Sequence, residues 1–192
     1  MLQLIKKIRE RTGAGMVAVK KAIDEAGGDE EKAIEILRKQ GAGKALKRAD
    51  KEAKEGVIVS YIHSNNKIGT LIKLLCETDF VARNEDFQQL AKDIAMHATA
   101  LNPRFIKPEE VASEIVAKER EIWTAQLTQE GKTAEMIEKI LVGKEKKFRE
   151  ESALLTQAFV KDPQKTVGDL IVENISKMGE KIEIGEMVRF EL

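Results

Sequence analysis

The sequence predicts an α+β protein in which a small N-terminal helical bundle precedes an antiparallel sheet core covered by helices. Three observations lead to this fold class. Apolar residues recur at helical spacing through the first forty residues, alternate as in strands from Gly56 to Cys76, and return to a helical period before a strand-like end at residues 182–190. Strands separated in this way by several helices indicate an antiparallel sheet that helices cover on one face.

Residues 1–40 are predicted to form three short helices. Leu4, Ile5 and Ile8 recur at helical spacing before Thr12-Gly13-Ala14-Gly15 interrupts the pattern. The second helix is indicated by residues that resume this spacing, namely Val17, Val19, Ala22, Ile23 and Ala26. Gly27-Gly28 ends it, and Asp29 is suited to be the N-cap of a third helix that ends at Gly41.

Helices this short are marginal in water alone, because fewer than ~12 to 15 residues rarely hold a helix, so the three must share one core. The arrangement resembles a ubiquitin-associated-type three-helix bundle. Residues 41–55 are Ala-rich and charged, with Leu46 as the one large apolar residue, which is typical of a solvated helix or linker. We therefore expect a bundle domain at 1–40, a linker at 41–55 and a core domain at 56–192.

The core domain begins with a predicted hairpin. Apolar residues alternate through Val57–Ile62, and after Ser64-Asn65-Asn66 a second apolar run covers Ile68–Cys76. Helical periodicity then dominates at residues 87–101, 109–129 and 133–157, the last with an expected break at Gly143. The apolar residues near the end, Ile182, Ile184, Val188 and Phe190, indicate one or two more strands.

Composition restricts the function without naming it. Lys plus Arg equals Asp plus Glu at 33 each among 192 residues, and the chain holds eight aromatics, which weakens the possibility of an RNA-binding translation protein. No run approaches the ~18 apolar residues of a membrane helix, and no continuous apolar segment near the start suits a secretory signal. A single cysteine, Cys76, excludes an intrachain disulfide and fits a reducing compartment. We expect a cytoplasmic protein without direct nucleic-acid or membrane binding.

The segment Thr78-Asp79-Phe80-Val81 places an acid beside a large aromatic where an apolar strand ends. Residues 84–86 then suit a helix start, so the segment forms a strand-to-helix connection, a place where rigid scaffolds often carry binding residues. Taken alone, Asp79 could cap the following helix and Phe80 could lie in the core.

Three segments together resemble the elongation factor Ts family, and they span most of the chain. The first match is residues 78–87, the second is residues 8–16, and the third is residues 159–163 followed by 165–167. The resemblance implies a guanine-nucleotide exchange factor that binds elongation factor Tu in its GDP-bound and nucleotide-free states.

The resemblance also assigns roles to particular residues. Thr78, Asp79, Phe80 and Val81 would act near the magnesium and switch region of the GTPase and disturb its magnesium and phosphate site. A second group, consisting of Arg9, Met16 and Val17, would face its nucleotide domain and dock the factor. The chain resembles the short form of the family with a single core module, which implies a homodimer through the sheet.

No enzyme active site, metal site or cofactor site is predicted. His63 and His97 have no partner at metal-ligand spacing, and Cys76 belongs to an apolar strand. The Gly13-Ala14-Gly15 turn joins two helices and lacks the Gly-Lys-Ser/Thr ending of a phosphate-binding loop. The alternative function is a protein-interaction adaptor that uses the ubiquitin-associated-type bundle, although this leaves the Asp79-Phe80 corner unexplained.

Overall fold

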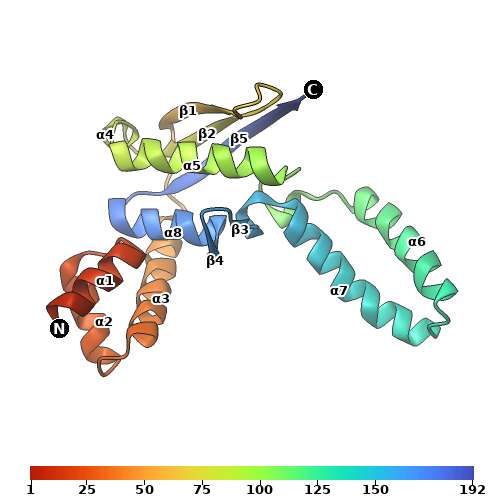
Figure 1. Ribbon diagram of the computed structural model, residues 1–192, viewed down its shortest axis with the longest axis horizontal. Coiled ribbons are helices and arrows are strands. Elements are labelled where there is room, and N and C mark those ends of the chain that lie inside the picture. Colours follow the sequence, from red (N-terminus) through yellow and green to blue (C-terminus); the bar gives the residue numbers. More distant parts are fainter. The chain divides into compact units, whose positions relative to one another are not determined.

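The computed structural model describes residues 1–192 and confirms the α+β class, with N-terminal helices followed by a sheet core (Figure 1). The bundle consists of α1 (Leu2–Thr12), α2 (Met16–Glu25) and α3 (Glu30–Arg48). Gly13 ends α1 with φ 65°, a left-handed conformation that glycine adopts without steric cost, so the chain can reverse into α2 within three residues.

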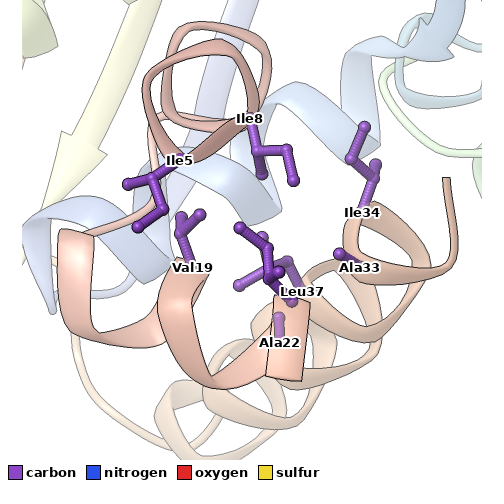
Figure 2. Packing of buried hydrophobic residues seen from close by; sticks show 8 residues of the cluster. Ile5, Ile8, Val19, Ala22, Ala33, Ile34 and Leu37 are labelled. Carbon is purple, nitrogen blue, oxygen red and sulfur yellow. The ribbon is translucent and has the colours of Figure 1, made fainter. Parts of the chain in front are cut away.

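The three helices share one apolar core, as their short lengths require (Figure 2). Its buried residues are Ile5, Ile8, Val19, Ala22, Ile23, Ala33, Ile34 and Leu37. Val17, which shares the helical spacing of the predicted second helix, is exposed instead. The predicted N-cap of the third helix is also confirmed, because the Asp29 carboxylate accepts a hydrogen bond from the Lys32 backbone N–H at 3.0 Å.

The expected end of the third helix at Gly41 is wrong, because α3 continues to Arg48. Gly41 is buried in the helix, and a Cβ at this position would lie 3.5 Å from Cγ1 of Val172 in α8 (Val167–Met178). A Cβ at that distance would make ordinary van der Waals contact, so Gly41 is an interior position of α3 and does not mark a C-cap. The Ala-rich, Lys-rich sequence beyond it favours helix, so the segment expected to be a helix or linker is helical up to Arg48.

The main sheet has the strand order β1-β2-β5 and is antiparallel throughout. The strands are β1 (Glu55–Ile62), β2 (Ile68–Cys76) and β5 (Ile182–Glu191), so the predicted hairpin is confirmed and the apolar residues near the end form one strand. Alternate residues of β2, Thr70, Ile72, Leu74 and Cys76, are buried. They define the covered face of the sheet.

A long helix, α5 (Glu85–Leu101), lies against this sheet (Figure 1). The hydroxyls of Thr99 in α5 and Thr70 in β2 are hydrogen-bonded at 2.8 Å within the buried layer. Phe87, near the start of α5, is completely buried. The short helix α4 (Asp79–Ala82) connects β2 to α5.

Residues Ala100–Gly168 form a second compact unit, and Met1–Thr99 with Asp169–Leu192 form the first. The second unit contains α6 (Ser113–Gln129) and α7 (Ala134–Ser152), which pack through a small core of Leu127, Ile137 and Leu141. Its remaining elements are the 3-10 turns η1 (Pro108–Glu110) and η2 (Leu154–Thr156) and the strands β3 (Ala158–Phe159) and β4 (Asp162–Thr166). The domain boundaries expected at 40 and 55 stay a prediction.

One further expectation about helices is wrong, and one helix was not predicted. The break at Gly143 is absent, because α7 is continuous, and an exposed glycine within a helix costs only ~1 kcal/mol relative to alanine. The helix α8 was not expected at all. Its buried residues Val167, Ile171 and Ile175 recur every four positions, a helical signal that the sequence does contain.

Candidate functional site

The corner between β2 and α4 consists of Thr78, Asp79, Phe80 and Val81, the four residues singled out in the sequence. Thr78 is the N-cap of α4, and its side-chain oxygen accepts a hydrogen bond from the Val81 backbone N–H at 3.4 Å. A second bond, from the Ala82 N–H to the Thr78 carbonyl at 3.2 Å, closes the helical turn. The corner is therefore a hydrogen-bonded turn of fixed geometry.

The side chains of this corner differ in how far they are buried. Val81 is buried and holds α4 against the protein, whereas Phe80 is 79% exposed. Asp79 is also exposed and forms an ion pair with Arg83 at 2.9 Å. An exposed pair of this kind is worth only ~0 to 1 kcal/mol, so Asp79 can leave Arg83 at little cost.

Neither structural alternative for Asp79 and Phe80 is supported by this geometry. Thr78 caps α4 in place of Asp79, and Phe80 lies outside the core. The corner thus presents an acid and an unburied aromatic side by side on a short rigid turn. Aromatic side chains are enriched at protein–protein interfaces, so an exposed Phe beside an acid is suited to contact a partner.

Arg9, Met16 and Val17, the second predicted group, are all exposed at the junction of α1 and α2. Arg9 and Met16 line one shallow depression, and Val17 follows Met16 in the first turn of α2. The hydrogen bond from the Gly13 N–H to the Arg9 carbonyl, at 2.8 Å, brings the start of α2 beside the turn that carries Arg9. We call Arg9, Met16 and Val17 the docking group.

Comparison with known proteins shows the family of the whole chain. The sequence model of the family described as elongation factor TS matches residues 3–192, which is nearly the whole chain. The chain belongs to the elongation factor Ts family.

Individual relatives match over almost their full length. Elongation factor Ts of Thermosipho melanesiensis is 53% identical over 188 residues, covering 98% of this chain and 96% of the relative. The corresponding proteins of Fervidobacterium nodosum and Thermodesulfovibrio yellowstonii are 50% and 52% identical over 190 residues each. Both alignments cover 99% of this chain; they cover 96% of the Fervidobacterium nodosum protein and 94% of the Thermodesulfovibrio yellowstonii protein. Membership in the elongation factor Ts family places the chain among translation elongation factors.

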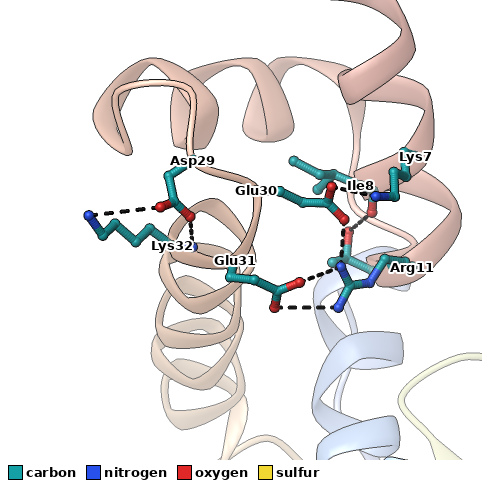
Figure 3. Close-up of polar contacts among 8 residues, drawn as sticks. Lys7, Ile8, Arg11, Asp29, Glu30, Glu31 and Lys32 are labelled. Atoms are coloured by element: carbon teal, nitrogen blue, oxygen red, sulfur yellow. Dashed lines mark hydrogen bonds and ion pairs between the residues drawn. The ribbon is translucent and has the colours of Figure 1, made fainter.

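The docking group lies on a bundle that is braced by ion pairs between α1 and α3 (Figure 3). The Glu30 carboxylate contacts both Lys7 and Arg11 at 2.6 Å, and Arg11 also contacts Glu31 at 2.7 Å. The hydrogen bond from Lys7, followed by that from Arg11, holds the pKa of Glu30 below its ordinary value. These contacts join α1 to α3 at the surface, above the apolar core that the two helices share with α2.

The side chains of Cys76 and His97, two other groups considered in the sequence, are both buried. Burial raises the pKa of the Cys76 thiol to about 11, and the Glu180 charge adds to this effect, so the thiol is protonated near neutral pH. His97 is fully buried. No three or more His, Cys, Asp or Glu side chains gather where they could hold a metal ion. Every helix is too short or too polar to cross a membrane.

Sequence reasoning missed Glu180, which contacts the corner directly. Its carboxylate accepts hydrogen bonds from the backbone N–H and the hydroxyl of Thr78, a residue 102 positions earlier in the chain. The position follows Gly179 at the end of α8, where an acid resembles any surface loop residue. Only the pairing of β5 with β2 brings it to the corner.

Proposed function

We propose that this chain is a guanine-nucleotide exchange factor that binds elongation factor Tu carrying GDP and promotes release of the nucleotide. The observation that carries the proposal is the exposed Phe80 beside Asp79 on the capped turn of α4. Membership in the elongation factor Ts family supports it. The proposed site of action is the cytoplasm, where translation elongation takes place.

The corner would act by insertion near the bound magnesium of the GTPase. In nucleotide-binding GTPases Mg²⁺ bridges phosphate oxygens and a protein hydroxyl, so displacing the groups around it weakens nucleotide binding without breaking a covalent bond. Asp79 supplies a negative charge and Phe80 an apolar wedge. The exchange reaction therefore requires no nucleophile, general base or cofactor from this chain.

The size of the effect available from Phe80 can be worked out from its exposure. With 79% of the residue exposed, a side chain of ~200 Å² leaves ~160 Å² to bury, which at ~25 cal/mol per Å² is ~4 kcal/mol. Each ~1.4 kcal/mol corresponds to a factor of ten, so complete burial supplies up to roughly a thousandfold shift in affinity. This energy promotes exchange only if Phe80 is buried more in the nucleotide-free state than in the GDP-bound state.

The docking group would supply affinity rather than displacement. Met16 and Val17 are exposed apolar side chains, and Arg9 places a permanent charge beside them. The bundle carries these residues on helices that are separate from the exchange corner. We propose that Arg9, Met16 and Val17 hold the factor on the nucleotide domain while the corner acts.

We further propose that two copies associate through the uncovered face of the main sheet. This face carries exposed apolar residues from all three strands: Ile58, Ile62, Leu71, Val188 and Phe190. Its charged pair Lys73 and Glu186 is joined within one copy at 3.3 Å, so the face lacks an unbalanced charge that would repel its own copy. A second copy related by a twofold axis would cover the same residues on both partners.

The test of exchange is stopped-flow release of a fluorescent GDP analogue from elongation factor Tu, with unlabelled GDP in excess. Catalytic amounts of this chain should accelerate release through repeated turnovers. Release at the intrinsic rate, together with undetectable binding of the chain to elongation factor Tu, would refute the proposal.

A further inference from the structure

Glu180 joins the loop between α8 and β5 to the base of the exchange corner. One carboxylate oxygen accepts hydrogen bonds from the backbone N–H groups of Glu77 and Thr78, at 3.1 and 3.0 Å. The other accepts the Thr78 hydroxyl at 2.6 Å. All three donors belong to the two residues that precede Asp79. Hydrogen bonds to an ionised acceptor are stronger than those between neutral groups, so this carboxylate fixes the peptide that leads into α4.

The Thr78 hydroxyl transmits this constraint to α4. A hydroxyl has one proton to donate and lone pairs that accept. Since the Thr78 proton is directed to Glu180, a lone pair faces the Val81 N–H and serves as the N-cap at 3.4 Å. Glu180 therefore orients the cap of the turn that carries Phe80.

Glu77, just before the corner, is in turn bonded to the loop that carries Glu180. Its carboxylate accepts a hydrogen bond from the Lys181 backbone N–H at 2.6 Å, while its own N–H donates to Glu180. Arg48, at the end of α3, binds the same Glu77 carboxylate at 3.0 Å. The loop before β5 and the corner after β2 are thus bonded to each other in both directions.

We propose that Glu180 is a positioning residue of nucleotide exchange, which fixes the direction in which Asp79 and Phe80 project without itself displacing any group of the GTPase. The proposal rests on the proposed exchange function. Exposure leaves most of the Phe80 side chain without packing contacts, so its direction depends on the backbone beneath it. A fixed backbone removes the orientation entropy that a mobile wedge would lose on insertion.

The test separates positioning from docking by kinetics. The rate of GDP release from elongation factor Tu is measured against the concentration of factor, which gives a plateau and a half-saturating concentration. Glu180→Ala should lower the plateau by about tenfold, since the loss of hydrogen bonds to a charged acceptor shifts an equilibrium by about that ratio. The half-saturating concentration should change less than about twofold, because the docking group is intact.

A conservative variant distinguishes positioning from loss of folding. Gln is nearly isosteric with Glu, and its carbonyl oxygen still accepts the backbone N–H groups, but its NH₂ group cannot accept the Thr78 proton. Glu180→Gln should therefore fold normally and give a plateau between those of the wild type and Glu180→Ala. The matched control is Glu135→Ala, which removes an exposed glutamate whose ion pair is with Lys139 in α7. This variant should match the wild type.

The outcomes separate the inference from the function on which it rests. A wild-type chain that fails to accelerate release would overturn both. An accelerating wild type with unchanged plateaus in both Glu180 variants would overturn only the positioning role. A raised half-saturating concentration at full plateau would also overturn it, because loss of folded protein or of docking rescales the concentration axis and leaves the limiting rate intact.

Discussion

Truncation of Phe80 is expected to impair exchange while leaving the fold nearly intact. In Phe80→Ala the folded protein loses the contacts of about a fifth of the side chain, because Phe80 is 79% exposed. A fifth of ~200 Å², at ~25 cal/mol per Å², is ~1 kcal/mol, so the free energy of unfolding should fall by no more than this amount.

Phe87 supplies the matched comparison, since the same substitution there removes a fully buried ring. Phe87→Ala should cost ~3 to 5 kcal/mol of stability through lost burial and a residual cavity. Urea titration of both variants, followed by circular dichroism, measures the two values.

Phe80→Ala should lose more of the GDP-release rate than Phe87→Ala, although it loses less stability. Phe80→Ala should lower the plateau rate of GDP release by at least about tenfold, a part of the ~4 kcal/mol that burial of the exposed ring can supply. Folded Phe87→Ala, corrected for its folded fraction, should keep most of the plateau. The reasoning is refuted if Phe80→Ala unfolds several kcal/mol more easily than the wild type, or if it exchanges GDP at the wild-type plateau.

Three other perturbations test separate parts of the structure. Val17→Asp should raise the half-saturating concentration of the factor and keep the plateau rate. The control Leu46→Asp, at a similarly exposed site of α3, should change neither value. A lowered plateau for Val17→Asp would contradict the docking role. Ile62→Lys should convert a dimer into a monomer in light scattering over a concentration series, and a wild-type chain that is monomeric throughout would refute the sheet interface. Because the pKa of Glu30 is lowered in the folded state, its contribution to stability should be present above the ordinary glutamate pKa of ~4.3 and be lost as the pH falls through the lower folded value. Urea titration at decreasing pH should show less acid destabilisation in Glu30→Gln, and identical pH profiles would exclude the contribution.

The parts of the fold that local patterns specify could be predicted from the sequence. An alternating segment before a polar turn and an apolar run after it predicted the hairpin of β1 and β2. Helical spacing likewise predicted most of the bundle core, although Val17, which has the same spacing, is exposed. The exposure of Phe80 was left open, because the sequence places it beside buried Val81 without showing which side chain faces inward.

The features that could not be predicted depend on contacts between distant segments. Gly41 resembles a helix end in sequence, but the structure places it inside α3, buried beside Val172. The same applies to Glu180, whose role depends on the pairing of β5 with β2. Local sequence thus indicated where the corner lies, and tertiary structure was needed to find the residue that orients it.

Reciprocal binding tests the central claim most directly, which is that this chain prefers nucleotide-free elongation factor Tu. The dissociation constant of the chain is measured for elongation factor Tu with and without GDP, and that of GDP is measured with and without saturating chain. Thermodynamic linkage requires the two ratios to be equal. We predict that GDP weakens binding of the chain by the same large factor by which the chain weakens binding of GDP. Equal affinity of the chain for the two states would contradict the account, because a ligand without such a preference shifts no equilibrium however tightly it binds.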